Sequence, residues 1–542
     1  MIPRHAAPFL AASLLASAAV AAPQLDQNIR ESLQSRVDTG GLASVVVGLV
    51  EGGETSIHVF RKSSATLPDE HSVFEIGDVS KTFTALLLAQ AAKTGSVRLE
   101  QPVATLLPGY SIPSYQGAPI TLLDLATHAS GLPRQPGNMP LERPLDPYSD
   151  YQLSGMRAFL AGHQLTRKPG AVYEYSHLGY GLLGSALAAQ AKLPFPQLVR
   201  DRITGPLGMD STGLALAPAL RDRVMPGFMP SGQVSPNWTM DAMAGTSAIS
   251  STVPDMLRYL SAMMRAEKGS PYAMTVQPRR AVDAVGTQSG LAWKLATLRG
   301  ARIAWHEGRT GGYGSFAGFT LDGRRGVVIL TNTAAAMEEV GLNALVPGGK
   351  PERVLLRQSP AALAAYAGRY ELTPGVIVTL RPSRGGGLIE HTTGQGKGLV
   401  FAIGEDRFGT VGSDKELVFQ RDAAGTVHAL ILRHPELEDR IAKKLPNEQR
   451  ASVSLPLRTL REYAGRFRVD GGIMAIFSVK DRQLHVQWGQ ERFTLTPAAE
   501  DEFFNTERGL ELRFKRNPAL KVYGLSARED GQVISGFFVS ER

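Results

Sequence analysis

The sequence predicts an α+β domain followed by two small β-barrels, and three observations support this prediction. Strand patterns at 44–60 and 326–332 flank a long middle stretch with helical spacing, which is typical of a sheet covered by helices. After residue 352 the pattern changes to short alternating strands separated by turn residues. An eight-residue segment then occurs twice, 97 residues apart, which indicates two tandem units of one all-β fold.

The α+β domain is expected to span residues 22–350. Ser44-Val-Val-Val-Gly-Leu-Val50 has the pattern of a buried strand, and 56–60 is expected to be its hairpin partner after a Glu-Gly-Gly-Glu turn. Residues 82–92 show helical spacing, and 326–332 form another apolar run of strand length. Strands at both ends of a helical middle predict a single sheet that packs against those helices.

The two barrel units are expected at 358–448 and 455–542, after a hinge at 347–352 that contains proline, glycine and lysine. Leu363-Ala-Ala-Tyr-Ala-Gly-Arg-Tyr370 recurs as Leu460-Arg-Glu-Tyr-Ala-Gly-Arg-Phe467. The alternative is that two unrelated strand–turn segments share a Tyr-x-Gly motif. We favour a true repeat, because chance agreement over eight positions is rare, and expect each unit to close a small barrel.

The first 21 residues are predicted to be a signal peptide. Arg4 and His5 supply positive charge before the alanine-rich apolar stretch 6–20, which is too short to span a bilayer. Ala19-Val20-Ala21 matches an A-x-A cleavage site, so we expect cleavage after Ala21 and a periplasmic or secreted mature chain. A retained anchor is the alternative. No later apolar run reaches about 18 residues, so we expect no embedding in a membrane.

The composition excludes several classes of function. The chain of 542 residues has no cysteine, so disulfides, thiol catalysis and cysteine-ligated metals are excluded. Its net charge of +8 is mild for this length, and the basic residues are scattered, which argues against nucleic-acid binding. The 11 histidines form no H-E-x-x-H or similar cluster, so we expect neither a metal nor another cofactor.

The strongest chemical signal lies in Phe74-Glu-Ile-Gly-Asp-Val-Ser-Lys-Thr-Phe-Thr-Ala85. This segment resembles the block that begins the central helix of the serine β-lactamases, penicillin-binding carboxypeptidases, D-aminopeptidases and related esterases. In that family an S-x-x-K motif places a nucleophilic serine and a lysine one helical turn apart, where the lysine can take the serine's proton. The register here is Asp78-Val-Ser-Lys81, so the resemblance implies that Lys81 is kept and that Asp78 replaces the nucleophile.

An aspartate at position 78 predicts impaired acyl transfer. Attack by a carboxylate on an amide would give a mixed anhydride, which is uphill. An ion pair with Lys81 would also favour the charged lysine, by about 4 kcal/mol at 4 Å and an effective dielectric near 20. Two alternatives stay open: Asp78 activates a water, or it serves only as a helix N-cap worth about 1 kcal/mol. Ser80, about 200° around a helix from Asp78, is expected to face the protein interior.

A second block, Gly170-Ala-Val-Tyr-Glu-Tyr-Ser-His-Leu-Gly-Tyr-Gly-Leu-Leu-Gly184, resembles the Y-x-N element of the family and the helix after it. The resemblance places Tyr175 where a tyrosine shares proton transfer with the lysine. It places His177 at the asparagine, a position that varies among esterase-like relatives, and so implies a role in substrate binding. The alternative is a structural histidine.

A third block, Trp305-His-Glu-Gly-Arg-Thr-Gly-Gly-Tyr-Gly-Ser-Phe-Ala-Gly-Phe319, resembles the H-x-G version of the family's K-T-G strand. Alternation along a strand would direct His306 and Gly308 to one side, and glycine would let the substrate backbone approach closely. The resemblance implies that His306, Gly308 and Arg309 bind substrate, and that the amides of Asp78 and Arg309 form an oxyanion hole.

Three further blocks, 122–133, 205–209 and 250–256, follow the family's order. With six ordered blocks over about 300 residues, the chain is identified as a member of the penicillin-recognising serine hydrolase family, similar to the class C β-lactamases. The resemblance implies a β-lactamase-like antiparallel sheet flanked by helices, with a lobe of helices and loops. The two repeated units resemble the lipocalin-like barrels appended to D-aminopeptidase-type members.

Three functional hypotheses follow. The first is an exported hydrolase homologue for D-amino-acid peptides, β-lactams or esters whose acyl-transfer activity is lost or impaired by Asp78. The second is a non-catalytic binding protein for peptidoglycan fragments or for a protein partner. The third is a deliberate substitution at position 78 that traps substrate in an otherwise active hydrolase.

Overall fold

The structure is a computed structural model that describes residues 22–63, 68–140, 142–143, 145–230, 232–383, 385–393, 397–410, 414–435, 437–446, 451–469, 474–488, 491–529 and 532–539. The predicted signal peptide lies outside these residues. The chain divides into two compact units, of which the first contains the residues up to Arg30 and Leu42–Glu352. The second contains Glu31–Gly41 and the chain from Arg353 onward.

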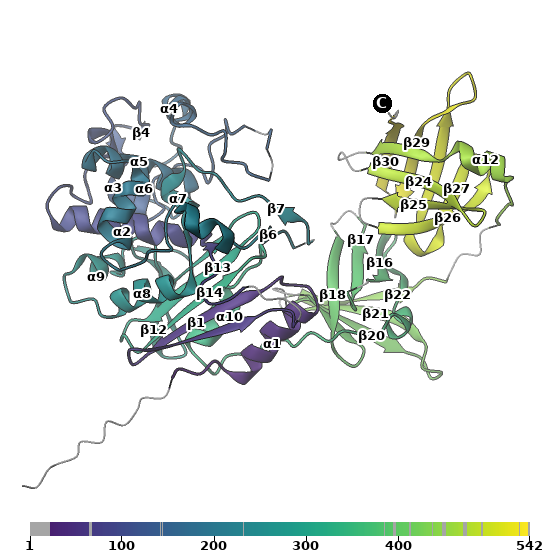
Figure 1. The fold of residues 1–542 in the computed structure, drawn as a ribbon, viewed down its shortest axis with the longest axis horizontal. Coiled ribbons are helices and arrows are strands. Elements are labelled where there is room, and N and C mark those ends of the chain that lie inside the picture. Colours follow the sequence, from purple (N-terminus) through teal and green to yellow (C-terminus); the bar gives the residue numbers. More distant parts are fainter. Residues whose placement is uncertain are drawn as a thin grey trace, which may run out of the picture. The chain divides into compact units, whose positions relative to one another are not determined.

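The first unit is built on an eight-stranded antiparallel sheet, which confirms the predicted α+β layering (Figure 1). The predicted hairpin is present, and its first strand pairs with the predicted strand near 326–332, so the two ends of this unit meet in one sheet. In sheet order the strands are β2 (Glu54–Phe60), β1 (Val45–Glu51), β14 (Arg325–Thr331), β13 (Gly314–Thr320), β12 (Ala301–Arg309), β11 (Lys294–Leu298), β10 (Gln288–Ser289) and β9 (Arg280–Ala281).

Two helices cover the central strands of this sheet from opposite faces. Val253 of α8 (Val253–Met264) lies against Gly48 of β1, whereas Gly341 of α10 (Glu338–Leu345) lies against the ring of Phe316 on β13. Gly48 pairs with Val328, which pairs with Ala317, so Phe316 is on the other face by strand alternation. Both faces are therefore buried, which explains the continuous apolar pattern of β1, β13 and β14.

The remaining helices of this unit gather in a lobe beside the sheet (Figure 1). The predicted helix near 82–92 is α2, and its buried face belongs to the main apolar core of the unit. The helices are α2 (Ser80–Lys93), α3 (Leu122–Ala126), α4 (Leu153–Gly162), α5 (His177–Ala191), α6 (Phe195–Val199), α7 (Ala244–Ser247) and α9 (Pro271–Thr275), with the short turns η1 (Gly77–Val79), η2 (Val103–Thr105), η3 (Arg200–Thr204) and η4 (Pro218–Arg223).

Three two-stranded sheets complete the first unit, and α1 (Gln27–Asp38) runs across its boundary with the second. The small sheets pair β3 (Phe74–Glu75) with β8 (Ser250–Ser251), β4 (Ser114–Tyr115) with β5 (Ala118–Pro119), and β6 (Gly227–Phe228) with β7 (Val234–Ser235). The β3–β8 pair joins two of the predicted family blocks directly before the first turn of α2. Among the residues that the structure describes, none of the helices combines the length and apolar character needed to cross a membrane.

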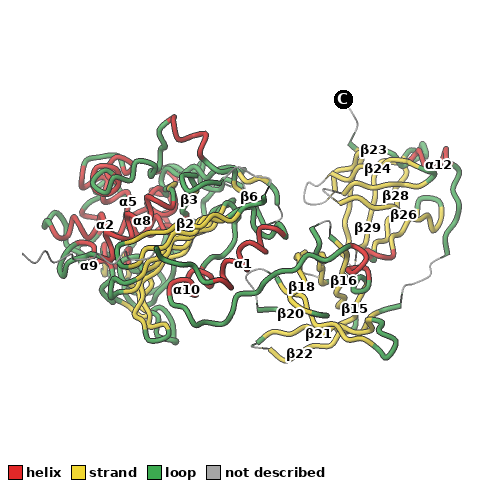
Figure 2. The backbone as a smooth tube through the Cα atoms, turned by 60° about the horizontal axis from the view of Figure 1, so that its bottom comes forward, coloured by secondary structure: helices red, strands yellow, loops and turns green. Residues whose placement is uncertain are grey.

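The second unit contains two closed eight-stranded barrels, which confirms the prediction of two tandem β units (Figure 2). The first consists of α11 (Pro360–Ala364), β15 (Gly368–Thr373), β16 (Val376–Pro382), β17 (Leu388–Thr392), β18 (Lys397–Gly404), β19 (Arg407–Gly409), β20 (Glu416–Arg421), β21 (Val427–His434) and β22 (Leu437–Lys444). The second consists of α12 (Leu457–Glu462), β23 (Gly465–Val469), β24 (Met474–Lys480), β25 (Gln483–Trp488), β26 (Glu491–Ala499), β27 (Glu502–Asn505), η6 (Thr506–Arg508), β28 (Leu510–Arg516), β29 (Val522–Glu529) and β30 (Gln532–Phe538). Their likeness to lipocalin-type modules stays a prediction.

The repeated sequence segments occupy equivalent places in the two barrels. Each covers the end of a short helix and the start of the first strand, and the glycine that begins this strand, Gly368 or Gly465, has a positive φ of 142° or 155°. Each barrel is filled by its own cluster of apolar side chains, with Tyr370 and Phe467 at corresponding positions. The repeat is therefore structural, because it encodes the same helix, turn and core residue twice.

The barrels also share a trio of polar side chains that the sequence analysis did not predict. In the first, Tyr366 donates a 2.8 Å hydrogen bond to Asp406, and Arg421 pairs with the same carboxylate at 2.7 Å. In the second, Arg516 pairs with Asp501 at 2.8 Å and contacts the hydroxyl of Tyr463 at 3.3 Å. These contacts secure corresponding turns of the two barrels.

Candidate active site

Asp78 lies where the helical lobe meets the sheet, in the turn η1 that leads into α2. This turn packs so closely against the end of β12 that only glycine fits at two positions. A β-carbon on Gly77, whose φ is 48°, would lie 2.8 Å from the amide nitrogen of Arg309. One on Gly308 would lie 2.7 Å from the amide nitrogen of Asp78. The two amides assigned to an oxyanion hole are therefore on adjoining backbone segments.

The carboxylate of Asp78 accepts hydrogen bonds from side chains of α2, of α7 and of the loop before α5. Lys81 Nζ donates to Oδ1 at 2.6 Å, the hydroxyl of Ser247 donates to the same oxygen, and the hydroxyl of Tyr175 donates to Oδ2 at 2.9 Å. No backbone amide of α2 is capped by the Asp78 side chain, so the N-cap alternative is wrong. Both carboxylate oxygens of Asp78 already accept hydrogen bonds from these three side chains, so neither oxygen caps the end of α2.

The ion pair of Asp78 and Lys81 is buried, and the two pKa values reflect this. Burial lowers the pKa of the Lys81 ammonium and the Asp78 carboxylate raises it in part, so that its pKa is about 8. Burial raises the pKa of Asp78, but Lys81, His177 and Ser247 outweigh it and hold this pKa well below its usual range. With this pKa Lys81 is largely protonated at neutral pH, and Asp78 is ionised.

Tyr175 faces both members of the ion pair. Its ring centre lies 5.0 Å from Lys81 Nζ, and the ring of His128 stacks on it at 4.1 Å. Burial raises the pKa of the Tyr175 phenol well above 10, and the charge of Asp78 raises it further. Tyr175 is therefore a neutral phenol whose hydrogen is donated to Asp78.

The two predicted histidines are buried and uncharged. His177 Nδ1 lies 3.7 Å from Asp78 Oδ1, and His177 Nε2 has no partner among the described residues. Burial lowers the pKa of His177 to about 3 and that of His306 to about 4, although Asp78 opposes both shifts. His306 Nδ1 lies 2.6 Å from the carbonyl oxygen of Glu307, so the hydrogen of the neutral ring is on Nδ1. Neither ring supplies positive charge at neutral pH.

The neighbours of β12 divide as strand alternation predicts. Gly308 pairs with Ser315 and faces the turn that holds Asp78. Glu307 is directed toward Glu338 at the start of α10, and Glu338 in turn accepts from Lys294 at 2.8 Å and from the indole of Trp305. A second ion pair, Lys294 with Glu338, thus links β11 to α10 beside β12 and does not involve Asp78.

Six of the seven predicted site residues line one cleft, which has a volume of about 600 Å³. Lys81 is the seventh, and it lies beneath Asp78 with no exposed surface. The six residues are Asp78, Tyr175, His177, His306, Gly308 and Arg309. Their assigned roles in catalysis and substrate binding stay predictions, but one cleft gathers residues from three family blocks.

The cleft also contains residues that the sequence analysis did not single out. Six of them are Arg134, Gln135, Tyr148, Tyr173, Trp238 and Lys294. Arg134 and Gln135 directly follow the block that ends at Pro133, so extending that block by two residues would have found them. Ser80, in contrast, is buried away from Asp78 and accepts from the amide of Ile249, as expected for a structural serine.

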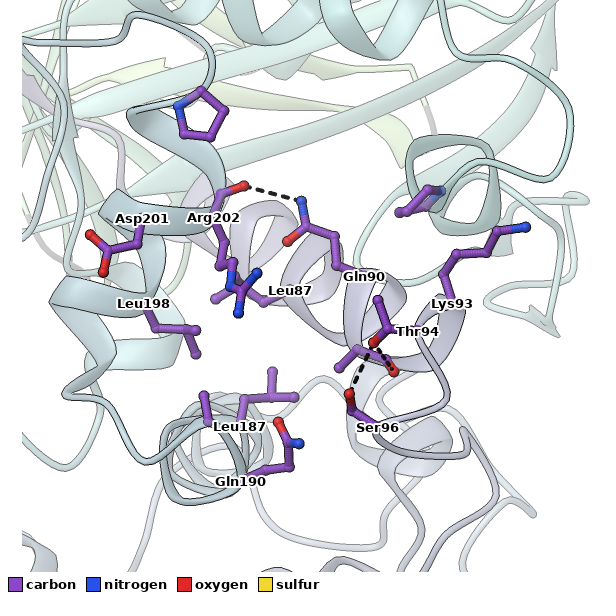
Figure 3. A pocket seen from close by; sticks show the side chains of 14 residues that line it. Leu87, Gln90, Lys93, Thr94, Ser96, Leu187, Gln190, Leu198, Asp201 and Arg202 are labelled. Atoms are coloured by element: carbon purple, nitrogen blue, oxygen red, sulfur yellow. Dashed lines mark hydrogen bonds between the residues drawn. The ribbon is translucent and has the colours of Figure 1, made fainter.

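A larger hollow of about 710 Å³ lies at the other end of α2 (Figure 3). Its wall includes Leu87, Leu187 and Leu198, and Gln90 donates to the carbonyl of Arg202 at 3.2 Å. None of the predicted site residues lines it. Cavity size alone therefore does not single out a site, and the gathering of titratable groups around Asp78 makes that cleft the candidate. The described ranges contain no group of three or more side chains suited to a metal ion.

Comparisons with known proteins identify the family of the first unit. A family model described as Beta-lactamase matches residues 25–346, more than half of the chain. The D-alanyl-D-alanine-carboxypeptidase/endopeptidase AmpH of Escherichia coli is 30% identical over 256 residues, which cover 46% of this chain and 64% of AmpH. The chain thus spans less than two thirds of the length of that relative. A Beta-lactamase of Pseudomonas fluorescens is 26% identical over 339 residues, which cover 56% of this chain and 91% of that protein.

Solved structures support the fold of the first unit. The Beta-lactamase/D-alanine Carboxypeptidase from Yersinia pestis superposes with a TM-score of 0.52 at 23% identity, covering 59% of this chain and 95% of that one. A class C beta lactamase from Rhodobacter sphaeroides gives 0.51 at 21% identity, covering 59% and 97%. Because the family model spans the sheet, the helical lobe and the cleft around Asp78, the chain belongs to the beta-lactamase family.

Proposed function

We propose that this chain binds the ligands of its family in the Asp78 cleft but does not form an acyl-enzyme with them. The ligands would be D-amino-acid peptides, β-lactams or esters. The observation that carries the proposal is the position of Asp78. This residue lies three positions before Lys81, accepts a hydrogen bond from it, and lies between Tyr175 and β12. In the family's S-x-x-K motif this is the place of the nucleophilic serine.

Two steps of acyl transfer would fail at this site. The first is nucleophilic attack, because a carboxylate that is held by three donors is a weak nucleophile and gives an unstable anhydride. The second is proton transfer, because Lys81 is protonated at neutral pH and Tyr175 already donates its hydrogen to Asp78. The aspartate at position 78 therefore replaces the nucleophile and, through its ion pair, keeps the base Lys81 protonated.

Ligand binding does not depend on those two steps. The amides of Asp78 and Arg309 lie on adjoining segments whose spacing is set by Gly77 and Gly308 rather than by the residue-78 side chain. The cleft volume of about 600 Å³ is suited to a small peptide or a β-lactam. The likeness to a protein named D-alanyl-D-alanine-carboxypeptidase/endopeptidase favours a D-alanyl peptide.

A binding protein for peptidoglycan fragments or for a protein partner is therefore the second candidate, and the cleft would then be its ligand site. A trapped form of an active hydrolase is the third.

Export to the periplasm is part of the proposal, and the charged and apolar residues 1–21 support it. N-terminal sequencing of the mature protein would show whether it begins at residue 22.

The decisive experiment compares the native chain with Asp78→Ser. We expect the variant to be labelled by a fluorescent penicillin and to hydrolyse a chromogenic ester about 10³-fold faster or more, because both the nucleophile and a neutral lysine return. Asp78→Asn is the matched control, since it removes the charge without adding a nucleophile. Ordinary turnover by the native chain would contradict the proposal. If neither chain reacts but both bind a D-alanyl peptide, the binding protein is favoured.

A further inference from the structure

His128 is a buried residue with an unusual backbone conformation, two residues after the end of α3. Its φ is 54°, in the left-handed region that residues other than glycine seldom adopt. Such a conformation persists only where the surrounding structure fixes it, and these positions gather at functional sites. The contacts of His128 therefore show what this conformation serves.

Both residues that flank Tyr175 in the chain donate their backbone amides to His128. The amide of Glu174 donates to the carbonyl oxygen of His128 at 2.6 Å. The amide of Ser176 donates to Nδ1 of the His128 ring at 3.0 Å. One residue thus binds the chain directly before and directly after Tyr175, which fixes the backbone of Tyr175 from both ends.

The ring of His128 fixes the side chain of Tyr175 as well. The two rings stack with their centres 4.1 Å apart and their planes inclined by 29°. The His128 ring also lies 4.9 Å from the ring of Tyr180 in α5, whose hydroxyl donates to the carbonyl of Ala126 at 2.7 Å. The ring that supports Tyr175 is therefore itself anchored to a helix of the lobe.

The bond from the amide of Ser176 requires a neutral histidine ring. Nδ1 accepts a hydrogen bond only when it carries no hydrogen, so the ring hydrogen is on Nε2. Burial lowers the pKa of His128 well below 6.5, and the charge of Lys81 lowers it further, which agrees with a neutral ring. His128 therefore acts on Tyr175 through geometry and not through charge.

We propose that His128 is a positioning residue that directs the hydroxyl of Tyr175 toward residue 78. In the native chain this hydroxyl donates to Asp78 Oδ2 at 2.9 Å. With a serine at position 78, the same placement would hold the phenol at the group to which the family resemblance assigns proton transfer. The effect of His128 on acyl transfer rests on the proposed function, whereas the placement of Tyr175 in the native chain can be measured without it.

Two variants separate the contacts of His128. His128→Phe keeps a ring that can stack but removes the acceptor for the Ser176 amide. His128→Asn keeps an acceptor bonded to Cγ, as Nδ1 is, and tolerates the left-handed conformation, but it removes the ring. The matched control is His163→Phe, because His163 also stacks on an aromatic ring, that of Phe159 at 5.0 Å, and does not line the cleft.

The first measurement is made on the full native chain, whose tyrosines carry ¹³C at Cζ. The nuclear magnetic resonance signal of Tyr175 is the one that is absent from Tyr175→Phe. We expect His128→Phe and His128→Asn each to shift this signal, because the phenol no longer meets Asp78 in the same way, and His163→Phe to leave it in place. A Tyr175 signal that stays in place in both His128 variants would overturn the inference.

The second measurement uses the Asp78→Ser chain and a chromogenic ester. There we expect His128→Phe to lower kcat about 100-fold with little change in KM, because a small misplacement of a group that transfers a proton slows the chemical step. In the chain that also carries Tyr175→Phe, the same change should cause no further loss, since its effect passes through Tyr175.

The outcomes separate the inference from the proposed function. Equal losses of kcat from His128→Phe with and without Tyr175, or an equal loss from His163→Phe, would overturn the inference and leave the proposed function standing. An Asp78→Ser chain without any activity would count against the proposed function, and the Tyr175 signal alone would then decide the inference. His128→Asn keeps both measurements possible if His128→Phe does not fold.

Discussion

The cleft and the barrels contain the same three kinds of side chain in very different surroundings. In the cleft, Asp78 accepts from Lys81 and Tyr175. In the barrels, Asp406 and Asp501 are each held by an arginine beside a tyrosine. The Lys81 side chain is wholly buried, whereas that of Arg421 is 34% exposed.

This difference in burial changes what a carboxylate, a cation and a tyrosine can do. In the first barrel, where the side chains of Arg421 and Asp406 are 34% and 21% exposed, the trio is partly solvated, and the ion pair contributes little beyond linking neighbouring turns. In the interior the same charges are costly unless paired, and their pKa values shift enough to decide which group can exchange a proton. Burial beside an open cleft, rather than composition, is therefore what makes the Asp78 trio a candidate for function.

The largest effect is expected from removing the cation of each trio. Lys81→Met should lower the free energy of unfolding of the first unit by about 3–5 kcal/mol, because it leaves a buried carboxylate unpaired. The matched change Arg421→Met should cost about 1 kcal/mol or less, because Asp406 keeps its bond from Tyr366 and its contact with water. Hydrogen exchange of each unit would measure both. Equal losses in the two variants would contradict the comparison.

The next effect concerns pH. The folded-state pKa of Asp78 is below that of the unfolded chain, so its ionised form contributes stability above about pH 4 and this contribution is lost as the pH falls. The difference in unfolding free energy between the native chain and Asp78→Asn should therefore narrow by about 2 kcal/mol from pH 5 to pH 2.

Asp406→Asn provides the comparison for this pH effect. The pKa of Asp406 is also lowered, chiefly by its hydrogen bond from Arg421, but this carboxylate is partly solvated. The difference in unfolding free energy between Asp406→Asn and the native chain should also narrow from pH 5 to pH 2, but by a smaller amount. Chemical denaturation at a series of pH values would measure both slopes. A steeper slope for the barrel variant would contradict the assignment of the cleft as the more strongly coupled site.

The smallest effect is expected within the repeat itself. Asp406→Asn and Asp501→Asn should each destabilise the second unit by about 1 kcal/mol or less at neutral pH, and by similar amounts, because the two turns are built alike. Thermal unfolding of the single and double variants would test this. A loss in one barrel several times that in the other would show that the trios have diverged in role.

Much of the fold could be predicted because its signals are local in sequence. The β1–β2 hairpin and α2 have the periodicity of a buried strand and of a helix, and the barrel repeat matches itself at a fixed offset. The polar trio in the barrels was missed because Asp406 and Arg421 lie 40 and 55 residues from Tyr366, where no local pattern joins them. Only the closure of the barrel brings them together.

The cleft shows the same limit. Asp78, Lys81 and Tyr175 could be predicted from motifs, and the structure brings them into contact. The N-cap alternative for Asp78 was wrong, because helix-capping preferences describe an isolated helix and not a carboxylate surrounded by tertiary donors. Ser247 lies three residues before a recognised block, and its contact with Asp78 depends on how α7 packs beneath the turn.

The close packing of η1 on β12 has a further consequence for how such a site can change. The two backbone segments lie so close together that only the glycine hydrogens fit between them, since neither Gly77 nor Gly308 tolerates a methyl group there. The side chain of residue 78 can therefore be exchanged while the spacing between the two backbone segments stays the same. In a protein built this way, one substitution at the nucleophile position can remove acyl transfer while the binding surface is kept. One substitution back to serine can restore it.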